Sequence, residues 1–314
     1  MNLKNKTGGE ITSAKIDINS LPAQGGTSFC WCIASILRIL GKDTHQSDVR
    51  GFSLSAFSIW AHPAKDIKLW REPCAHLFTT LLLDSLALKG ELLNLPEGTR
   101  DHLGYFLHHW AGMVKTYLNE GIPLGAMEVW PESLWGIVTS WDPAQRVLKG
   151  YIPDSINEIN NRCWPTKLLL IGKKPLRQGL KTPLKTTLRN VSALGSNRIR
   201  PGNWASGIDA YLVWRKNAAE GFDYNAGEHL NLASNLSEAR KHAAFFLARH
   251  ADLGVQGTDR MMCSLTRRYN KVSSYLSEAA NAPGKQSFIN SLTAAAAEEE
   301  KALALVDELL VRLD

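Results

Sequence analysis

The sequence has few of the features that mark secreted or membrane-spanning proteins. Its five cysteines are an odd number without paired spacing, which argues against a disulfide framework and predicts a reducing, cytoplasmic location. No window approaches roughly 18 uninterrupted apolar residues, so we expect no membrane-spanning helix. Residues 1–20 are polar and lack the apolar core of a secretory signal, so we expect a leader arm of low order there.

Metal and nucleic-acid signatures are also missing. Cys30-Trp31-Cys32 is too tightly spaced for a CxxC redox or zinc pair, and no second pair completes a metal site, so we expect neither metal nor cofactor. Acidic residues are scarce between Gly172 and Lys216, where ten Lys or Arg accompany only Asp209. This basic stretch lacks RNP-like aromatics, a zinc module and a helix-turn-helix. We interpret it as a solvated connector and expect no nucleic-acid partner.

The hydrophobic patterning of the chain changes along its length. The 314 residues suffice for two domains of ordinary size. Helices are expected first and strands follow, which is an α+β signature, and a series of long amphipathic helices then predicts an all-α bundle. The expected helices are about 30–40, 74–89, 99–119, 204–219, 230–251, 258–280 and 287–313, and the expected strands are about 123–130, 134–141, 147–152 and 167–172. The large helical faces are compatible with a homodimer.

The stretch from Gln24 to Gly41 carries the strongest chemical signal. A Gly-rich loop turns into an apolar helical run, and Cys30 falls at that transition. The positive end of the helix dipole lowers the pKa of a thiol placed there, and the thiolate is the nucleophile of cysteine chemistry. The Gln24 amide, six residues upstream, is a candidate oxyanion donor. The alternative is that Cys30 and Cys32 are small apolar residues of a buried helix.

This stretch resembles the active-site helix of papain-like cysteine peptidases, in which a Gln, a short Gly/Ser loop and a Cys-Trp pair open a buried helix. Gly121-Ile122-Pro123 and Val138-Thr139-Ser140-Trp141-Asp142 are similar to strand motifs of bacterial peptidases that process double-glycine leader peptides. The later segments 207–214 and 239–244 resemble bacterial proteins related to the butirosin-biosynthesis acyltransferase. The resemblance implies a papain-like cysteine domain at 21–175. The residue patterns add a leader arm at 1–20, a basic linker at 176–203 and an α-helical domain at 204–314.

The sequence departs from the papain-like pattern at the catalytic base. The family's His would fall at Leu134, beside Trp135, and neither residue can take a proton. Glu132 is the nearest ionisable residue, and a carboxylate with a tuned pKa can act as a base. Two further alternatives stay open, namely a His from elsewhere and a site that is inactive as a peptidase. The candidate His residues are His62, His108 and His109.

The resemblance also implies the remaining roles. Asp154 lies near the position of the family's base-orienting Asp or Asn, and the alternative, which we prefer slightly, is a turn residue after Pro153. Trp31, Trp130 and Trp135 are candidate substrate-binding residues. We therefore expect a cysteine hydrolase or acyltransferase that forms an acyl-enzyme on a peptide, amide or thioester. The alternative is a catalytically degenerate protein of this fold that binds a peptide or small molecule.

Overall fold

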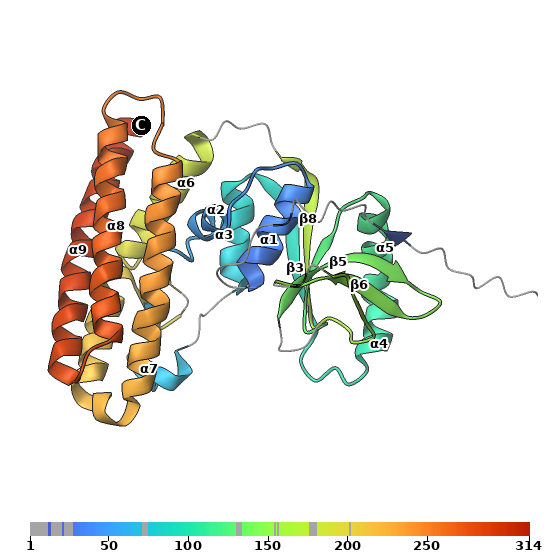
Figure 1. Ribbon diagram of the computed structural model, residues 1–314, viewed down its shortest axis with the longest axis horizontal. Coiled ribbons are helices and arrows are strands. Elements are labelled where there is room, and N and C mark those ends of the chain that lie inside the picture. The colour runs from blue at the N-terminus through green and yellow to red at the C-terminus, as the bar shows by residue number, and fades with distance from the viewer. Residues whose placement is uncertain are drawn as a thin grey trace, which may run out of the picture. The chain divides into compact units, whose positions relative to one another are not determined.

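The chain folds into two compact units, each built from two separate parts of the sequence. The computed structural model describes residues 12–13, 21, 28–70, 75–129, 134–153, 155, 157–175, 181–200 and 202–314 (Figure 1). The first unit comprises Met1–Val49 and Leu88–Leu176, and the second comprises Arg50–Ala87 and Arg177–Asp314. The described residues form an α+β fold with a helical C-terminal part, as predicted from the sequence. The boundaries of these two units differ from the continuous domain ranges expected from the sequence, because each unit combines two separate segments.

The first unit is organised around an antiparallel sheet in the order β3-β8-β4-β5-β6-β7. The central strand β5 pairs with β4 through Leu124↔Val138 and with β6 through Ile137↔Tyr151. Within the expected leader arm, β1 also pairs with β5, at Trp141 and Ser140. The strand bounds are β1 Thr12–Ser13, β3 Leu88–Asn94, β4 Leu124–Met127, β5 Trp135–Asp142, β6 Val147–Tyr151, β7 Ile159–Asn161 and β8 Lys167–Pro175.

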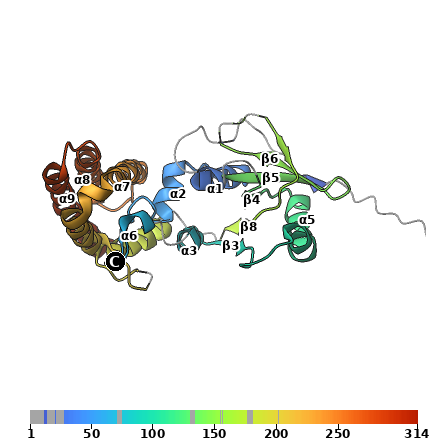
Figure 2. The same cartoon turned by 90° about the horizontal axis from the view of Figure 1, so that it is seen from below.

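Helices cover both faces of this sheet. Helix α1 (Ser28–Ile39) packs on β4 and β5 from one side, and α4 (His102–Tyr105) and α5 (Ala111–Asn119) lie on the other (Figures 1 and 2). Successive side chains of a strand point to opposite faces. Accordingly, Leu124 and Ala126 join the aromatic core beneath α5, whereas Gly125 lies against Cys32 of α1. The strand β4 therefore separates the two helical layers.

A π-helical turn connects α4 and α5. This turn, η3 (Phe106–Trp110), opens a row of core residues spaced four apart, which are Phe106, Trp110, Val114 and Leu118. A spacing of four exceeds the 3.6 residues of an α-helical turn, so the row would rotate away from the sheet along a regular α-helix. The wider π turn offsets part of that rotation at the end that carries the largest side chains.

Two local expectations differ from the structure. The helix expected over 74–89 is α3 (Ala75–Ser85), and the chain then enters β3 after Ala87, whose φ is +50°. Gly90 pairs with Ile171 inside the sheet, so the chain is already a strand at this point. The segment after Ala87 forms a strand because β8 offers it partners for backbone hydrogen bonds. Pairing with such a distant segment leaves no pattern in the local sequence. Helix α2 (Gln46–Phe52) was also not among the expected helices.

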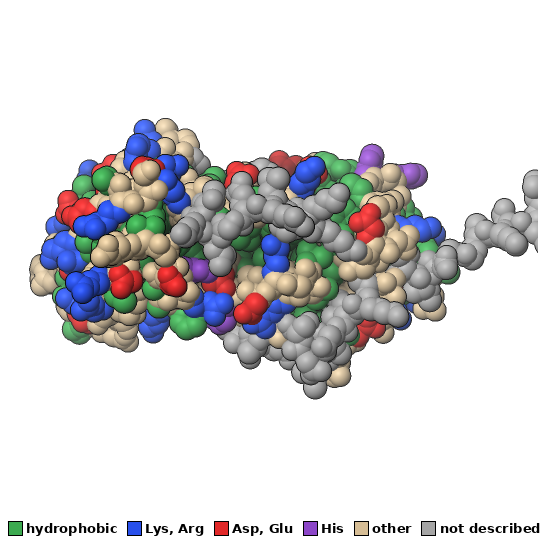
Figure 3. All heavy atoms as spheres, turned by 90° about the horizontal axis from the view of Figure 1, so that it is seen from above, with side chains coloured by type: hydrophobic (Ala, Val, Ile, Leu, Met, Phe, Trp, Pro, Cys, Tyr) green, Lys and Arg blue, Asp and Glu red, His purple; other side chains and the backbone are tan. Residues whose placement is uncertain are grey.

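The second unit is built mainly from long helices. Its C-terminal elements are α6 (Lys181–Gly195), α7 (Gly207–Arg249), α8 (Thr258–Ala280) and α9 (Lys285–Leu313). Helix α7 spans two of the expected helices, 204–219 and 230–251, which are separated by a kink at Asn225 (φ −130°, ψ 25°). None of the helices in the described part of the chain is long and apolar enough to span a membrane. Basic and acidic side chains intermingle on the face of this unit that Figure 3 shows.

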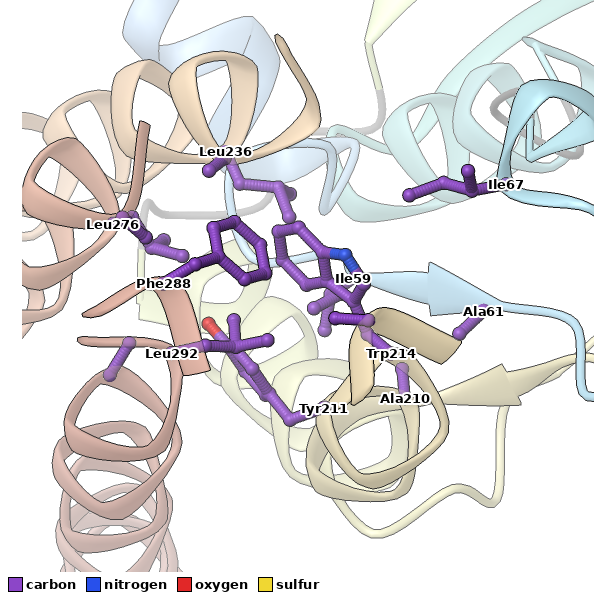
Figure 4. Close-up of a cluster of buried hydrophobic side chains, with 14 of the residues drawn as sticks. Ile59, Ala61, Ile67, Ala210, Tyr211, Trp214, Leu236, Leu276, Phe288 and Leu292 are labelled. Carbon is purple, nitrogen blue, oxygen red and sulfur yellow. The ribbon is translucent and has the colours of Figure 1, made fainter. Parts of the chain in front are cut away.

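The core of the second unit includes the segment 59–61, from the N-terminal half of the sequence. Ile59 and Ala61 of this segment join Trp214, Phe288 and other residues of α7 and α9 in one buried cluster (Figure 4). The short strand β2 (Trp60–Ala61) pairs with β9 (Ala205–Ser206) just before α7. The segment is thus part of the helical core.

Candidate functional site

Cys30 lies in the first turn of α1, the helix that starts beside the central strand of the first unit. The helix is apolar on nearly all sides, and its residues from Cys30 to Leu37 are buried. A helix that is hydrophobic all round is typical of a core position. Cys30 itself is only 4% exposed. No acidic residue occupies the first turn, so no carboxylate there competes for the positive end of the helix.

Three side chains of this first part of α1 hold it against the start of β5. The Oγ of Ser28 accepts a hydrogen bond of 3.2 Å from the backbone N–H of Trp135. The rings of Phe29 and Trp135 meet edge to face, with centroids 5.1 Å apart. The thiol of Cys32 donates a hydrogen bond of 3.3 Å to the carbonyl oxygen of Gly136. We call these five residues the α1–β5 clasp, and Cys30 lies between its members along the helix.

Cys32 is a structural thiol. It is fully buried, and that burial raises its pKa well above the ordinary range, with a smaller contribution from neighbouring Cys30. The helix approaches the sheet so closely here that a Cβ on Gly125 would lie 2.9 Å from the Cys32 sulfur. A glycine at this point of β4 therefore lets α1 reach the sheet. The two thiols of Cys30-Trp31-Cys32 thus occupy different chemical environments.

The structure brings some of the predicted site residues together. Cys30 and Trp31 are on α1, and Trp135 begins β5, where it contacts Phe29. Trp31 and Trp135 are 4% and 5% exposed, so nearly all of each side chain is packed inside the protein. Leu134, at the position expected for the family's His, directly precedes β5 and is partly buried. The other predicted residues, Gln24, Trp130, Glu132 and Asp154, lie outside the described residues.

The histidine alternatives separate by their place in the fold. His108 and His109 belong to η3, in the helical layer on the face of the sheet opposite α1. Both are exposed, and the sheet lies between them and Cys30, so neither is a base for this thiol. His62 belongs to the second unit, where its ring packs on Trp204 and its Nδ1 accepts from the N–H of Ala64.

Sequence reasoning missed the residues that hold Cys30 in place. Ser28, Phe29, Cys32 and Gly125 carry no motif. Two of the three clasp contacts end on backbone atoms and the third ends on a ring, all more than a hundred positions away. Among the described residues, no group of three or more His, Cys, Asp or Glu is arranged to hold a metal ion. Comparison with protein-family models and with curated proteins gave no match.

Proposed function

We propose that the chain is a cysteine hydrolase or acyltransferase of papain-like fold, with Cys30 as its nucleophile. One observation supports this most strongly: the α1–β5 clasp joins the first turn of the Cys30 helix to the start of a strand in an antiparallel sheet. In the family that the sequence resembles, the strand at this position carries the catalytic base. The helix dipole and the N–H groups of the first turn favour the thiolate of Cys30.

The proposed reaction passes through an acyl-enzyme. The Cys30 thiolate attacks the carbonyl carbon of a peptide, amide or thioester, a C–S bond forms, and the leaving group departs with a proton. Water or an amine then attacks the thioester, releases the acyl group and returns the thiol. The N–H groups at the start of α1 and the Gln24 amide are the proposed oxyanion donors. Glu132 is the proposed base in place of an imidazole, and Asp154 is the proposed base-orienting residue.

The direct test uses an electrophilic probe and an activated acyl ester. Cys30→Ala should abolish rapid labelling and the burst of acyl-enzyme formation, because the other thiol of α1, Cys32, is fully buried and its pKa is raised. Cys163→Ala is the matched control, since it removes an exposed thiol outside α1 and should change neither readout. Equal probe labelling and equal burst in Cys30→Ala and in the wild type would refute the proposal.

A second candidate function is supported by Leu134. An apolar side chain stands where the family has its imidazole, and Cys30 is 4% exposed, which suits a site that binds a peptide or small molecule without turnover. Under this alternative, ligand affinity survives Cys30→Ala and the wild type shows no acyl burst. A burst that depends on Cys30 would exclude it.

A further inference from the structure

We infer that Ser28 is the positioning residue for the Cys30 thiol, acting through the α1–β5 clasp; this inference rests on the proposed function. Ser28 is the first residue of α1, and its Oγ accepts a hydrogen bond from the backbone N–H of Trp135, the first residue of β5. Without the Ser28 hydroxyl, the Trp135 N–H at the start of this buried strand would lose its acceptor. A buried N–H without an acceptor costs free energy. The hydrogen bond therefore joins the beginnings of the two elements that flank the thiol.

The other clasp contacts make this geometry specific. Phe29 packs edge to face on Trp135, and Cys32 donates to Gly136, so two consecutive residues of β5 are held by one turn of α1. Contacts at Ser28 and Cys32, four positions apart, lie on one side of the helix and fix both its rotation and its height above the strand. Cys30 lies between them, so its position relative to the start of β5 follows from the clasp.

Ser28 differs from the other members in how it acts on the thiol. Phe29 and Cys32 are packing residues, and their removal would open cavities. The Ser28 hydroxyl instead fixes the end of the helix, where backbone N–H groups are without helical partners and carry the positive end of the dipole. Loss of this hydroxyl loosens the first turn and weakens the stabilisation of the Cys30 thiolate. The expected effect is therefore a change in thiol acidity, beyond any change in stability.

The test measures alkylation of Cys30 by iodoacetamide from pH 5 to pH 10, followed by tandem mass spectrometry of the Cys30 peptide, in four full-length proteins. These are the wild type, Ser28→Ala, Ser28→Thr and Ser35→Ala. Ser35 is the matched control, because its hydroxyl donates to the Trp31 carbonyl within the same helix, away from the clasp. Such back-bonding to position i−4 contributes little to a helix, so its loss should leave the Cys30 profile unchanged.

Ser28→Ala should move the alkylation midpoint to higher pH and slow Cys30 alkylation at pH 7 by about two- to five-fold, the range of a helix-end interaction. Ser28→Thr keeps the acceptor oxygen and should restore the wild-type profile. Hydrogen exchange at the Trp135 amide should become faster in Ser28→Ala alone. A Ser28→Ala profile equal to that of the wild type would overturn the positioning role, even with a lower melting temperature, as would an unchanged Trp135 exchange rate.

The same data separate this inference from the proposed function. A wild-type midpoint well below the ordinary thiol pKa of about 8.5 supports the nucleophile, whatever Ser28 contributes. A wild-type midpoint at that ordinary value, together with no acyl burst, removes the proposed function and this role of Ser28 with it. A low wild-type midpoint that Ser28→Ala leaves in place removes the positioning role alone.

Discussion

The sulfur of Cys32 lies directly over Gly125, where a Cβ would come within 2.9 Å of it, and the same thiol donates to the carbonyl of Gly136. Helix α1 and the sheet are thus in contact with no room for a methyl group between them. The Leu169 Cβ closes the other side, at 3.0 Å from the same point. The close packing of α1 on β4 follows from this one glycine.

Gly125→Ala should therefore destabilise the protein by about 1–3 kcal/mol, the usual cost of overpacking a core. Cys32→Ala in the same chain should recover part of that loss, because it removes the closest atom. Urea unfolding of the two single variants and the double variant measures the coupling. Gly112→Ala is the control: no atom lies within 4 Å of its Cβ, so this helical substitution should stabilise the protein slightly. Additive effects of Gly125→Ala and Cys32→Ala would contradict the prediction.

The raised pKa of Cys32 predicts a difference in thiol reactivity. Burial keeps this thiol protonated, so iodoacetamide should leave it unmodified in the folded protein at pH 8 while the exposed Cys163 and Cys263 react. After unfolding in urea, Cys32 should react like the others. Quantification of each cysteine peptide by mass spectrometry checks this. Alkylation of Cys32 in the folded protein at the rate of Cys163 would show that α1 opens from the sheet.

The sequence predicts those parts of the fold that are written in local patterns. The strands β5 and β6 were expected from the hydrophobic patterning of the chain, and both are present. The C-terminal helices were expected from their apolar stripes. Two of them lie within α7, where the non-helical geometry of Asn225 marks the kink between them. The strand β3 was missed because β8, far along the chain, supplies its pairing.

The candidate site was predictable to a smaller extent. Cys30 and Trp135 were singled out through a family resemblance, and the structure brings their elements together at the clasp. The residues that make the contact, Ser28 and Cys32, could not be found from sequence, since a serine hydroxyl or a buried thiol bonded to a distant backbone atom leaves no local pattern. Periodicity and turn chemistry report on neighbours in sequence, whereas a site is made by contacts between distant segments.

His229 predicts an acid-dependent loss of stability in the second unit. It is fully buried, and its Nδ1 accepts from the indole N–H of Trp214 over 2.9 Å. Burial lowers its pKa from 6.5 to about 4, although Asp66 acts in the opposite direction. Between these two values the unfolded chain binds a proton that the folded protein excludes. This contribution is therefore complete above pH 6.5 and is lost as the pH falls toward 4, amounting to roughly 3 kcal/mol.

The measurement is the free energy of urea unfolding at intervals from pH 7.5 to pH 4, compared between the wild type and His229→Gln. The variant has no titrating ring, so its stability should fall less steeply over this interval. Carboxylates titrate equally in both proteins, and the difference between the two curves isolates His229. Parallel curves over the whole interval would show that the imidazole of His229 is protonated in the folded protein as readily as in water.

A buried ion pair fixes the early segment of the second unit onto its helices. The Arg240 guanidinium, 0% exposed, pairs with the Glu299 carboxylate over 2.7 Å and also donates to the carbonyl oxygens of Ala56 and Ser58. Burial opposes the charged form of Arg240, but the Glu299 carboxylate outweighs it and the pKa is raised. The hydroxyl of Tyr211 donates to the same carboxylate over 2.6 Å. The Arg240 guanidinium and the Glu299 carboxylate therefore each provide the counter-ion that keeps the other charged in this buried cluster.

Glu299→Gln should consequently cost about 3–5 kcal/mol of unfolding free energy, because it leaves the Arg240 charge buried without its counter-ion. Replacing both partners by Met should cost less than the single change, since no buried charge then remains. Asp223→Asn is the control, because its ion pair with Lys285 is exposed and 3.9 Å long, and its loss should change stability by less than about 1 kcal/mol. Urea unfolding of the four proteins decides the matter. A Glu299→Gln variant as stable as Asp223→Asn would mean that solvent reaches Arg240, and the segment from Ala56 to Ser58 would then be held by apolar packing alone.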